Sequence, residues 1–353
     1  MRESSAVRSD IECRVIRTTL ELEAFVPEWS ALWCQDPRAT PFQRPEWLLP
    51  WWHQFGQLDL RATTIWQDGR LIGFLPFYVY PDHSTRERQL FLLGVGTTDY
   101  LDGIFLADCT ALHVQAALDL LLAEGGWETL SVSQLRPESV LCQALTLRSH
   151  PAVRRFESAA CSQMPAVRTA QLPVKIRRNA MYYRNRALRL GKLELVFANL
   201  SNWQAALDAL ERLHTERWES CGEPGVFADP RVGAWHREAI PGLQQCGALR
   251  LSTLRLNDET LGVLYSLVDP PARRHRTQYV YLPGHSIEHA ELRPGTLLLA
   301  SAIDHASNEG VEIIDMLRGH EAYKNIWHVR PVNTYGFDLH RDAFQCNFAN
   351  SAR

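Results

Sequence analysis

The sequence carries the same short motifs twice, in the same order. The motifs are a hairpin turn followed by Leu or Ile and Gly, a Gly-containing turn before an apolar run, and a Leu-Arg pair after that run. Each half also reads as helices, a hairpin, a strand, a loop, a helix and a strand. The repeat predicts two copies of one α/β (α+β) unit, each a mixed, mostly antiparallel sheet flanked by helices. The matching segments are residues 68–73 and 257–262, 124–130 and 309–314, and 135–137 and 317–319.

The predicted domains follow this repeat. We expect an N-terminal unit over residues 1–165, a linker with a basic helix over 166–200, and a C-terminal unit over 201–353. A chain of 353 residues is long enough for two or three domains, at about 150 residues each. Because only the second copy has a dense polar cluster, we expect the chemistry in the second half and a degenerate first half.

Composition and cysteine usage exclude several classes of protein. The formal net charge is −3, so the chain is no polycation for DNA. The eight cysteines are scattered and form no Cys-x-x-Cys pair, which argues against a zinc site and against a disulfide framework. No apolar run approaches 18 residues, and no signal peptide follows the polar N-terminus. We therefore expect a cytoplasmic protein without a metal or a membrane span, of undetermined oligomeric state.

Hydrophobic periodicity and turn residues predict most of the secondary structure. In the helix over 111–124, we expect Leu112, Ala116, Leu120 and Ala123 to be buried. Residues 133–170 are expected to be irregular. The predicted helices cover about 22–33, 45–55, 111–124, 175–190, 203–218, 232–245 and 296–308, and the predicted strands cover 60–66, 71–80, 90–95, 127–132, 193–197, 248–256, 261–268, 277–282 and a run from 311.

The helix that precedes Gly191 is strongly basic. Between residues 175 and 192 there are seven Lys or Arg residues and no acidic residue. Apolar residues at helical spacing make it amphipathic. Two interpretations stay open: a solvated face over an apolar stripe, or a face that binds phosphates of a nucleotide-bearing cofactor or of RNA.

The densest polar cluster follows the apolar strand that begins at residue 311. Charged and aromatic groups just past a strand end are typical of ligand sites in α/β folds. A buried ion-pair network of Asp315, Arg318 and Glu321 that only fixes the turn is the structural alternative. The cluster consists of Asp315, Arg318, His320, Glu321, Tyr323 and Lys324.

Several motifs along the chain together resemble one family. They are residues 40–43 with Trp47, residues 68–76, the arginines 177, 178 and 186, His214 with Arg217 and Trp218, residues 294–298, residues 309–310, Asp315, and residues 318–324. With these motifs the second half resembles acyltransferases of the GNAT superfamily. Within that superfamily, the chain is similar to the tandem-domain group of CelD (cellulose biosynthesis protein), which is related to the Fem aminoacyl transferases.

The resemblance implies an acyl-CoA-dependent N- or O-acyltransferase. The acyl group would pass directly from acyl-CoA, as co-substrate, to an amine or hydroxyl of a small molecule or saccharide. The turn before the helix at 296–308 is where this superfamily holds the pyrophosphate, and a helix N-terminus favours anions; an ordinary turn and cap is the alternative. The expected acyl-CoA contacts are Arg293, Gly295, Thr296, Leu297 and Tyr281.

A direct transfer also needs a general base and an acceptor pocket. Asp315 and Glu321 are the first candidates for the base and His320 is the third. Arg318 and Lys324 are expected to orient the carboxylates or to bind an anionic acceptor, and Tyr323 to donate a hydrogen bond in the transition state. A solvated loop is the alternative for the first three of the residues expected at the acceptor, which are Asp99, Tyr100, Asp102, His214, Arg217 and Trp218.

Two other functions are compatible with the same sequence. One is a Fem-like transferase that uses aminoacyl-tRNA and binds it through the basic helix. The other is a non-catalytic scaffold in a biosynthetic assembly. The intact polar cluster favours an enzyme over the scaffold.

Overall fold

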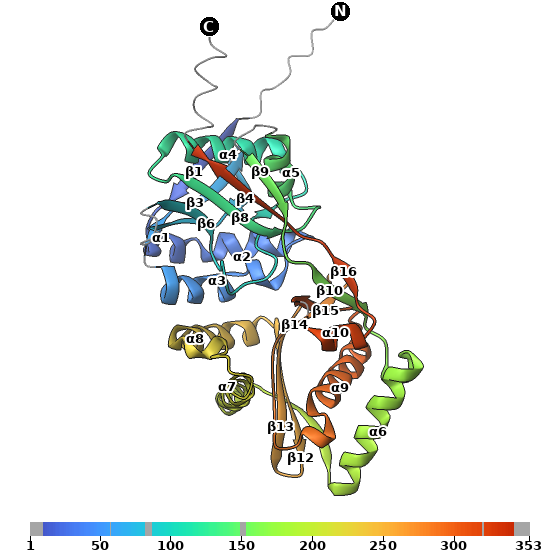
Figure 1. Ribbon diagram of the computed structural model, residues 1–353. Coiled ribbons are helices and arrows are strands. Elements are labelled where there is room, and N and C mark those ends of the chain that lie inside the picture. Colours follow the sequence, from blue (N-terminus) through green and yellow to red (C-terminus); the bar gives the residue numbers. More distant parts are fainter. Residues whose placement is uncertain (1–9, 57, 82–86, 149–152, 320, 342–353) are drawn as a thin grey trace, which may run out of the picture. The chain divides into compact units, whose positions relative to one another are not determined.

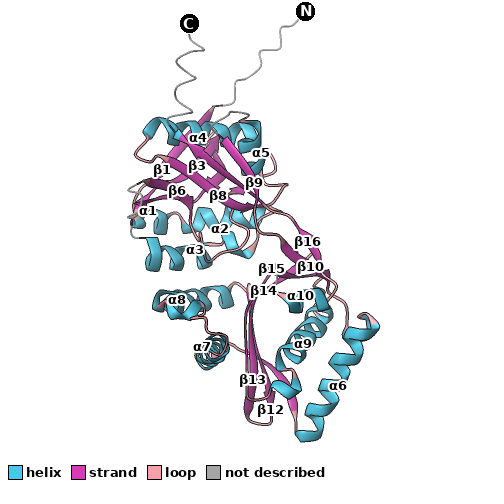
Figure 2. Cartoon of the chain, viewed as in Figure 1, coloured by secondary structure: helices cyan, strands magenta, loops and turns pink. Residues whose placement is uncertain are grey.

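The chain folds into two compact units of mixed α/β structure. The computed structural model describes residues 10–56, 58–81, 87–148, 153–319 and 321–341. Unit 1 comprises Met1–Ala159 and Asn333–Arg353, and unit 2 comprises Ala160–Val332. Both units combine mixed, mostly antiparallel sheets with flanking helices, which confirms the predicted fold class (Figures 1 and 2).

Unit 1 contains a four-stranded sheet of order β1-β3-β4-β7 and a six-stranded sheet of order β2-β5-β6-β8-β17-β9. Its strands are β1 (Ile11–Ile16), β2 (Asp59–Leu60), β3 (Ala62–Gln67), β4 (Arg70–Leu75), β5 (Phe77–Pro81), β6 (Arg88–Leu92), β7 (Ile104–Phe105), β8 (Thr129–Leu135), β9 (Val153–Glu157) and β17 (Tyr335–His340). Its helices are α1 (Thr19–Ala24), α2 (Val26–Gln35), α3 (Pro45–Trp51), α4 (Ala111–Glu124) and α5 (Val140–Leu147), with short turns η1 (Pro41–Gln43) and η2 (Trp52–Gly56).

Three predictions for the first half of the chain need correction. The strand predicted over 71–80 is two strands in different sheets, because Pro76 has no N–H for a ladder. The region predicted as irregular contains α5, β9 and the strand β10 (Cys161–Pro165). In α4 the bounds are right but the predicted face is wrong, since Leu112 is 68% exposed. Apolar residues surround most of α4, so periodicity alone does not select its buried face, which is Val114, Ala117, Leu118, Leu121 and Leu122.

Unit 2 is built on one seven-stranded sheet of order β11-β12-β13-β14-β15-β10-β16. Helices α6 and α9 cover one face of its central strands and α7 the other, with α8 packed beside α7 (Figures 1 and 2). The remaining elements are β11 (Leu193–Phe197), β12 (Leu249–Leu256), β13 (Glu259–Val268), β14 (Thr277–His285), β15 (Ile313–Arg318), β16 (Arg330–Val332), α6 (Val174–Leu190), α7 (Trp203–Glu219), α8 (Pro230–Gln245), α9 (Pro294–Asn308) and α10 (Ala322–Ile326), with η3 (Thr169–Gln171), η4 (Val226–Ala228) and η5 (Ala290–Leu292).

The repeat predicted from the sequence is present in the structure. Each unit has an antiparallel hairpin, β3-β4 or β12-β13, closed by a tight turn at Asp68 or Asn257. Both turn residues have positive φ, which Asp and Asn tolerate better than most residues. Each unit then has a helix, α4 or α9, between two parallel strands, β6 and β8 or β14 and β15. The chain therefore contains two copies of one α/β unit.

The unit boundaries differ from the predicted domains. The basic helix α6 packs on α9 and belongs to unit 2, so residues 166–200 are no separate linker. Strand β10 pairs with β15 and β16 of unit 2, whereas β17, near the C-terminus, pairs with β8 and β9 of unit 1. Each unit thus receives strands from distant parts of the sequence, which local patterns do not reveal.

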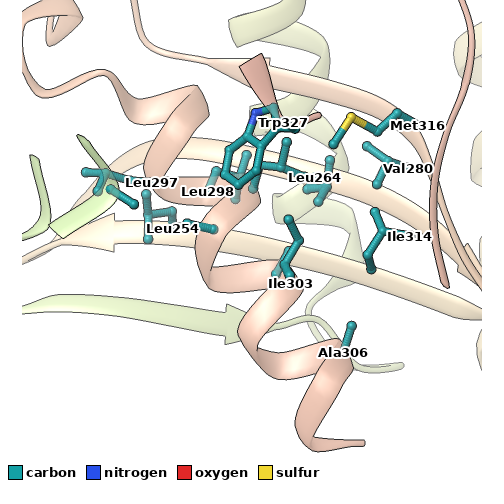
Figure 3. Packing of buried hydrophobic residues seen from close by; sticks show 14 of the residues in the cluster. Leu254, Leu264, Val280, Leu297, Leu298, Ile303, Ala306, Ile314, Met316 and Trp327 are labelled. Atoms are coloured by element: carbon teal, nitrogen blue, oxygen red, sulfur yellow. The ribbon is translucent and has the colours of Figure 1, made fainter. Parts of the chain in front are cut away.

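A continuous apolar core lies between the sheet of unit 2 and its helices α6 and α9 (Figure 3). Leu264, Val280 and Ile314 contribute from the strands, while Leu298 and Ile303 contribute from α9. Each fully buried side chain of this size stabilises the fold by about 1.5–3 kcal/mol. The core therefore fixes the position of α9 against β14, which matters for the site described below.

Two further properties bear on the predicted class of protein. Among the described residues, no helix is both long and apolar enough to cross a bilayer. In the same part of the chain, no group of three or more His, Cys, Asp or Glu residues is arranged to hold a metal ion.

Candidate active site

The parallel strands β14 and β15 separate at their carboxyl ends. They pair only from Thr277 to Tyr279 and from Ile313 to Asp315. Beyond that point β14 continues along β13 as far as His285, and β15 pairs with β10. A cavity of about 480 Å³ is lined by the part of β14 past the paired segment, including Val280 and His285. Because it opens where two parallel strands end, the cavity has the usual position of a ligand site in an α/β fold.

Four helices of unit 2 contribute the other walls of the cavity. The start of α9 supplies a polar wall, α6 and α10 supply mixed walls, and α7 supplies one charged side chain. The lining residues are Ile176, Asn179, Tyr183, Arg217, Leu264, Val280, Pro283, His285, Ser286, Ile287, Ala290, Arg293, Pro294, Gly295, Thr296, Leu298, Leu299, Tyr323, Ile326 and Trp327.

The N-terminus of α9 meets this cavity without a side-chain cap. Arg293 is the residue before the helix, in the left-handed conformation (φ 49°, ψ 58°), and its side chain makes no capping hydrogen bond. Pro294 fits the first helical position because that residue has no intrahelical N–H to lose. A Cβ atom on Gly295 would lie 2.9 Å from Cδ2 of His285, so this close approach requires glycine. The positive end of the helix dipole therefore adjoins the cavity.

The charges around the cavity are of one sign. Arg217 and Arg293 line it, and among the described lining residues there is no Asp or Glu. Neither guanidinium belongs to any ion pair within the described part of the chain. Together with the helix end, these arginines favour an anionic ligand.

His285 and Tyr323 are the titratable groups with shifted pKa values in the cavity. Burial, and then the charge of Arg217, lowers the pKa of His285 below its ordinary value of 6.5. Its Nδ1 atom is buried and has no hydrogen-bond partner among the described residues. Burial, and then Glu321, raises the pKa of Tyr323 to about 12. At neutral pH the site therefore holds a neutral imidazole, able to accept a proton, and a protonated phenol, able to donate one.

The structure brings part of the predicted set to this cavity. The predicted residues that line it are Arg293, Gly295, Thr296, Arg217 and Tyr323. Leu297 belongs to the apolar core instead. The Tyr281 ring packs against the rings of Trp235, His236 and Tyr265 rather than facing the cavity.

Asp315 and Lys324, predicted as catalytic, lie in a buried network that holds the turn after β15. The Asp315 carboxylate accepts hydrogen bonds from Leu317 N (2.7 Å) and from Gln163 Nε2 (2.8 Å). Lys324 Nζ donates to the carbonyls of Leu317 (3.2 Å) and Arg318 (2.6 Å).

These bonds fix a strained segment. Leu317 and Gly319 both have positive φ, which costs conformational energy at Leu317. Lys324 also pairs with Glu321 (2.9 Å), whose side chain is about half exposed. Asp315, Lys324, Glu321 and Arg318 are not among the cavity-lining residues. The geometry thus gives Asp315 and Lys324 a role in holding the turn, while their catalytic role stays a prediction. His320 lies outside the described residues.

The residues predicted at the acceptor fall into both units. In unit 2, His214 is buried and its Nδ1 lies 3.3 Å from Pro283 O, while its ring packs beside Trp218. In unit 1, Asp102 accepts hydrogen bonds from Gly103 N and Ser139 Oγ, both 2.8 Å. The predicted residues that unit 1 buries are Asp99, Tyr100 and Asp102. Their role at an acceptor stays a prediction.

Sequence reasoning missed four polar residues of the cavity. Asn179 and Tyr183 lie on α6 about one helical turn apart, His285 ends β14, and Ser286 follows it. No sequence signal marked Asn179, an exposed polar residue of a basic helix. His285 was not marked by a sequence signal either, because its expected role depends on a buried Nδ1 atom that has no hydrogen-bond partner.

Comparisons with known proteins agree with this geometry. Residues 174–325, which lie within unit 2, match the family model of an acetyltransferase (GNAT) domain. In a search by sequence, no curated protein matches the chain.

Solved structures with the same fold cover nearly the whole chain. FemX is similar with a TM-score of 0.64 at 12% identity, over 94% of this chain and 98% of FemX. A conserved protein of unknown function from Bacteroides thetaiotaomicron VPI-5482 has a TM-score of 0.61 at 12% identity, over 93% and 100%. L-PGS from Bacillus licheniformis has a TM-score of 0.56 at 13% identity, over 92% of each chain. At such identities the likeness shows the fold.

The matched domain, the paired units and the cavity at the strand ends define an acyltransferase class of protein. Unit 2 thus contains a GNAT acetyltransferase domain, and nearly the whole chain shares its fold with FemX.

Proposed function

We propose that the unit 2 cavity binds an acyl-CoA and transfers its acyl group to an amine or hydroxyl of a small molecule or saccharide. The observation that carries this proposal is that His285, whose imidazole is neutral and whose Nδ1 has no hydrogen-bond partner, lies in the same cavity as the uncapped N-terminus of α9. One feature serves an anionic co-substrate and the other serves proton removal.

The cavity walls suit the parts of an acyl-CoA. The start of α9, with Arg293 and Arg217, provides donors and positive charge for the pyrophosphate. The apolar walls include Leu264, Val280 and Leu298, which fit the pantetheine arm and an acyl chain.

The chain's own residues supply proton transfer. His285 takes the proton from the acceptor amine or hydroxyl as this atom attacks the thioester carbonyl carbon. The carbon–sulfur bond then breaks, and the departing thiolate takes a proton from the Tyr323 hydroxyl. The proton on His285 returns to Tyr323 through solvent. No cysteine lines the cavity in the described part of the chain, in agreement with direct transfer.

Ligand titration tests this proposal. A ligand that binds only the folded state raises the free energy of unfolding by about 2.7 kcal/mol at a hundredfold excess over Kd. We expect thermal shifts and calorimetric binding for CoA, acetyl-CoA or a longer acyl-CoA, and we expect Arg293→Ala to weaken that binding about tenfold.

Arg274→Ala is the matched control, because Arg274 is an exposed arginine of unit 2 outside the cavity lining. Equal weakening by both variants would assign the effect to net charge. Absence of binding by every CoA ligand would remove the proposal.

The surface of α6 favours one second candidate, a transferase that uses aminoacyl-tRNA. Its arginines form no ion pair among the described residues, so they are available for phosphates. Binding of tRNA with log K falling linearly in log salt, together with no CoA binding, would select this function.

A further inference from the structure

The outward side of α6 carries an apolar stripe. Val174, Met181 and Leu188 are spaced by seven residues and therefore lie along one line of the helix. Their exposed fractions are 52%, 52% and 48%. A different side of the helix is fixed in the core by Ile176 and Ala180, so the stripe cannot turn inward without breaking that packing.

Arginines border this stripe on both sides. At 100° per residue, Arg177 and Arg184 fall on one side of the stripe, and Arg178 and Arg189 fall on the other. None of the four belongs to an ion pair within the described residues. Over its whole length α6 contains no acidic residue to offset them.

The exposed aromatic residue of α6 adds to the same surface. Tyr182 is 60% exposed and lies beside the stripe on the side of Arg178. Aromatic rings with a polar group are favoured at the boundary between lipid headgroups and acyl chains.

We propose that this face of α6 docks on an anionic lipid surface. The stripe of Val174, Met181 and Leu188 enters the headgroup region, and the arginines on either side bind lipid phosphates. A surface helix with a central apolar stripe and flanking cations has the composition of an interfacial helix. This inference concerns a different surface from the cavity and stands without the proposed acyl transfer.

RNA fits the same face less well. Phosphate binding accounts for the arginines but gives no role to an aliphatic line between them. On a lipid surface both features contribute, because burial of the aliphatic groups and attraction of the cations act in the same direction. The apolar stripe therefore distinguishes the two partners.

Vesicle co-sedimentation of the full chain tests the inference. We expect binding to vesicles with about one third phosphatidylglycerol and much weaker binding to pure phosphatidylcholine. Replacing two cations, Arg184→Gln with Arg189→Gln, should weaken partitioning about thirtyfold. Replacing two stripe residues, Met181→Gln with Leu188→Gln, leaves the charge unchanged and should weaken partitioning about tenfold.

Leu112→Gln is the matched control, because Leu112 is an exposed leucine on α4 of unit 1 and should leave partitioning unchanged. Circular dichroism of each variant confirms that α6 is retained. The inference is overturned if the chain fails to bind anionic vesicles, or if the stripe variant binds them as well as the unchanged chain. It is also overturned if the chain prefers RNA to these vesicles and that binding needs only the arginines.

Discussion

The two units place a helix between parallel strands, and they treat the N-terminus of that helix differently. In unit 1, Nδ1 of His113 accepts a hydrogen bond from the Thr110 backbone N–H (3.0 Å), so a side chain of α4 occupies the helix end. In unit 2, the residue before α9 is Arg293, which makes no such bond, and the helix end adjoins the cavity. The same architecture thus has a closed helix end in one copy and an open one in the other.

The difference between the two helix N-termini gives a physical reason why only one unit would bind an anionic ligand. An anion site at a helix end needs backbone donors that no local side chain covers. It also needs space beside the helix, which in unit 2 comes from Gly295 and from the separation of β14 and β15. At the equivalent second position of its helix, unit 1 has Leu112. This contrast supports the proposal that binding and catalysis take place in unit 2.

The largest expected effect on catalysis comes from replacing His285, the proposed proton acceptor in unit 2. His285→Gln should lower kcat/KM about 10²- to 10⁴-fold, because it removes a positioned base. The pKa of His285 is lowered, so the acid limb of the pH profile of kcat/KM should lie below pH 6.5 and disappear in the variant. His275→Gln, at an exposed histidine paired with Glu312, is the control. A variant with unchanged rates would show that another group takes the proton.

Asp315→Asn tests whether Asp315 takes part in catalysis or holds the turn after β15 in unit 2. The substitution weakens the hydrogen bonds to Leu317 and Gln163, and we expect the free energy of unfolding to fall by about 3 kcal/mol. For the folded enzyme, kcat should change only a few-fold. Glu312→Gln, on an exposed neighbour, should leave both quantities unchanged. A hundredfold loss of kcat with intact stability would instead support the catalytic role predicted from the sequence.

Asp102, which is buried in unit 1, allows a test of how stability depends on pH. Burial raises its pKa to about 7 in the folded state, from an ordinary value of 3.8. Between these values the folded state binds more protons than the unfolded state, so this group lowers stability as pH rises. From about pH 5.5 to pH 8, the unfolding free energy of the unchanged chain should fall by about 2 kcal/mol relative to Asp102→Asn. Urea unfolding at both pH values measures this difference, and parallel curves for the two proteins would contradict the prediction.

Much of the fold follows from local patterns in the sequence. The turns at Asp68 and Asn257, the bounds of α4 and α7, and the repeat were predictable because they depend on turn chemistry and apolar periodicity. The exchange of strands was not predictable. Strands β10 and β17 acquire partners far away in the sequence, and nothing in their own residues specifies those partners.

The site was predictable where a residue's role comes from its backbone position, and less so where it comes from packing. Arg293 and Gly295 were found because a turn before a helix is visible in the sequence. Asp315 and Lys324 looked catalytic because charge density is visible but burial is not. His285 does not stand out in the sequence, and its expected role depends on burial that leaves its Nδ1 atom without a hydrogen-bond partner.

The most direct test of the account is calorimetric titration of acyl-CoA into Gly295→Val and Leu112→Val, which change the same position of α9 and α4. The account predicts that Gly295→Val abolishes binding, because a Cβ there would meet the His285 ring at 2.9 Å and crowd the helix end. It predicts that Leu112→Val binds like the unchanged chain. Full binding by Gly295→Val, with the fold intact, would contradict the assignment of the acyl-CoA site to unit 2.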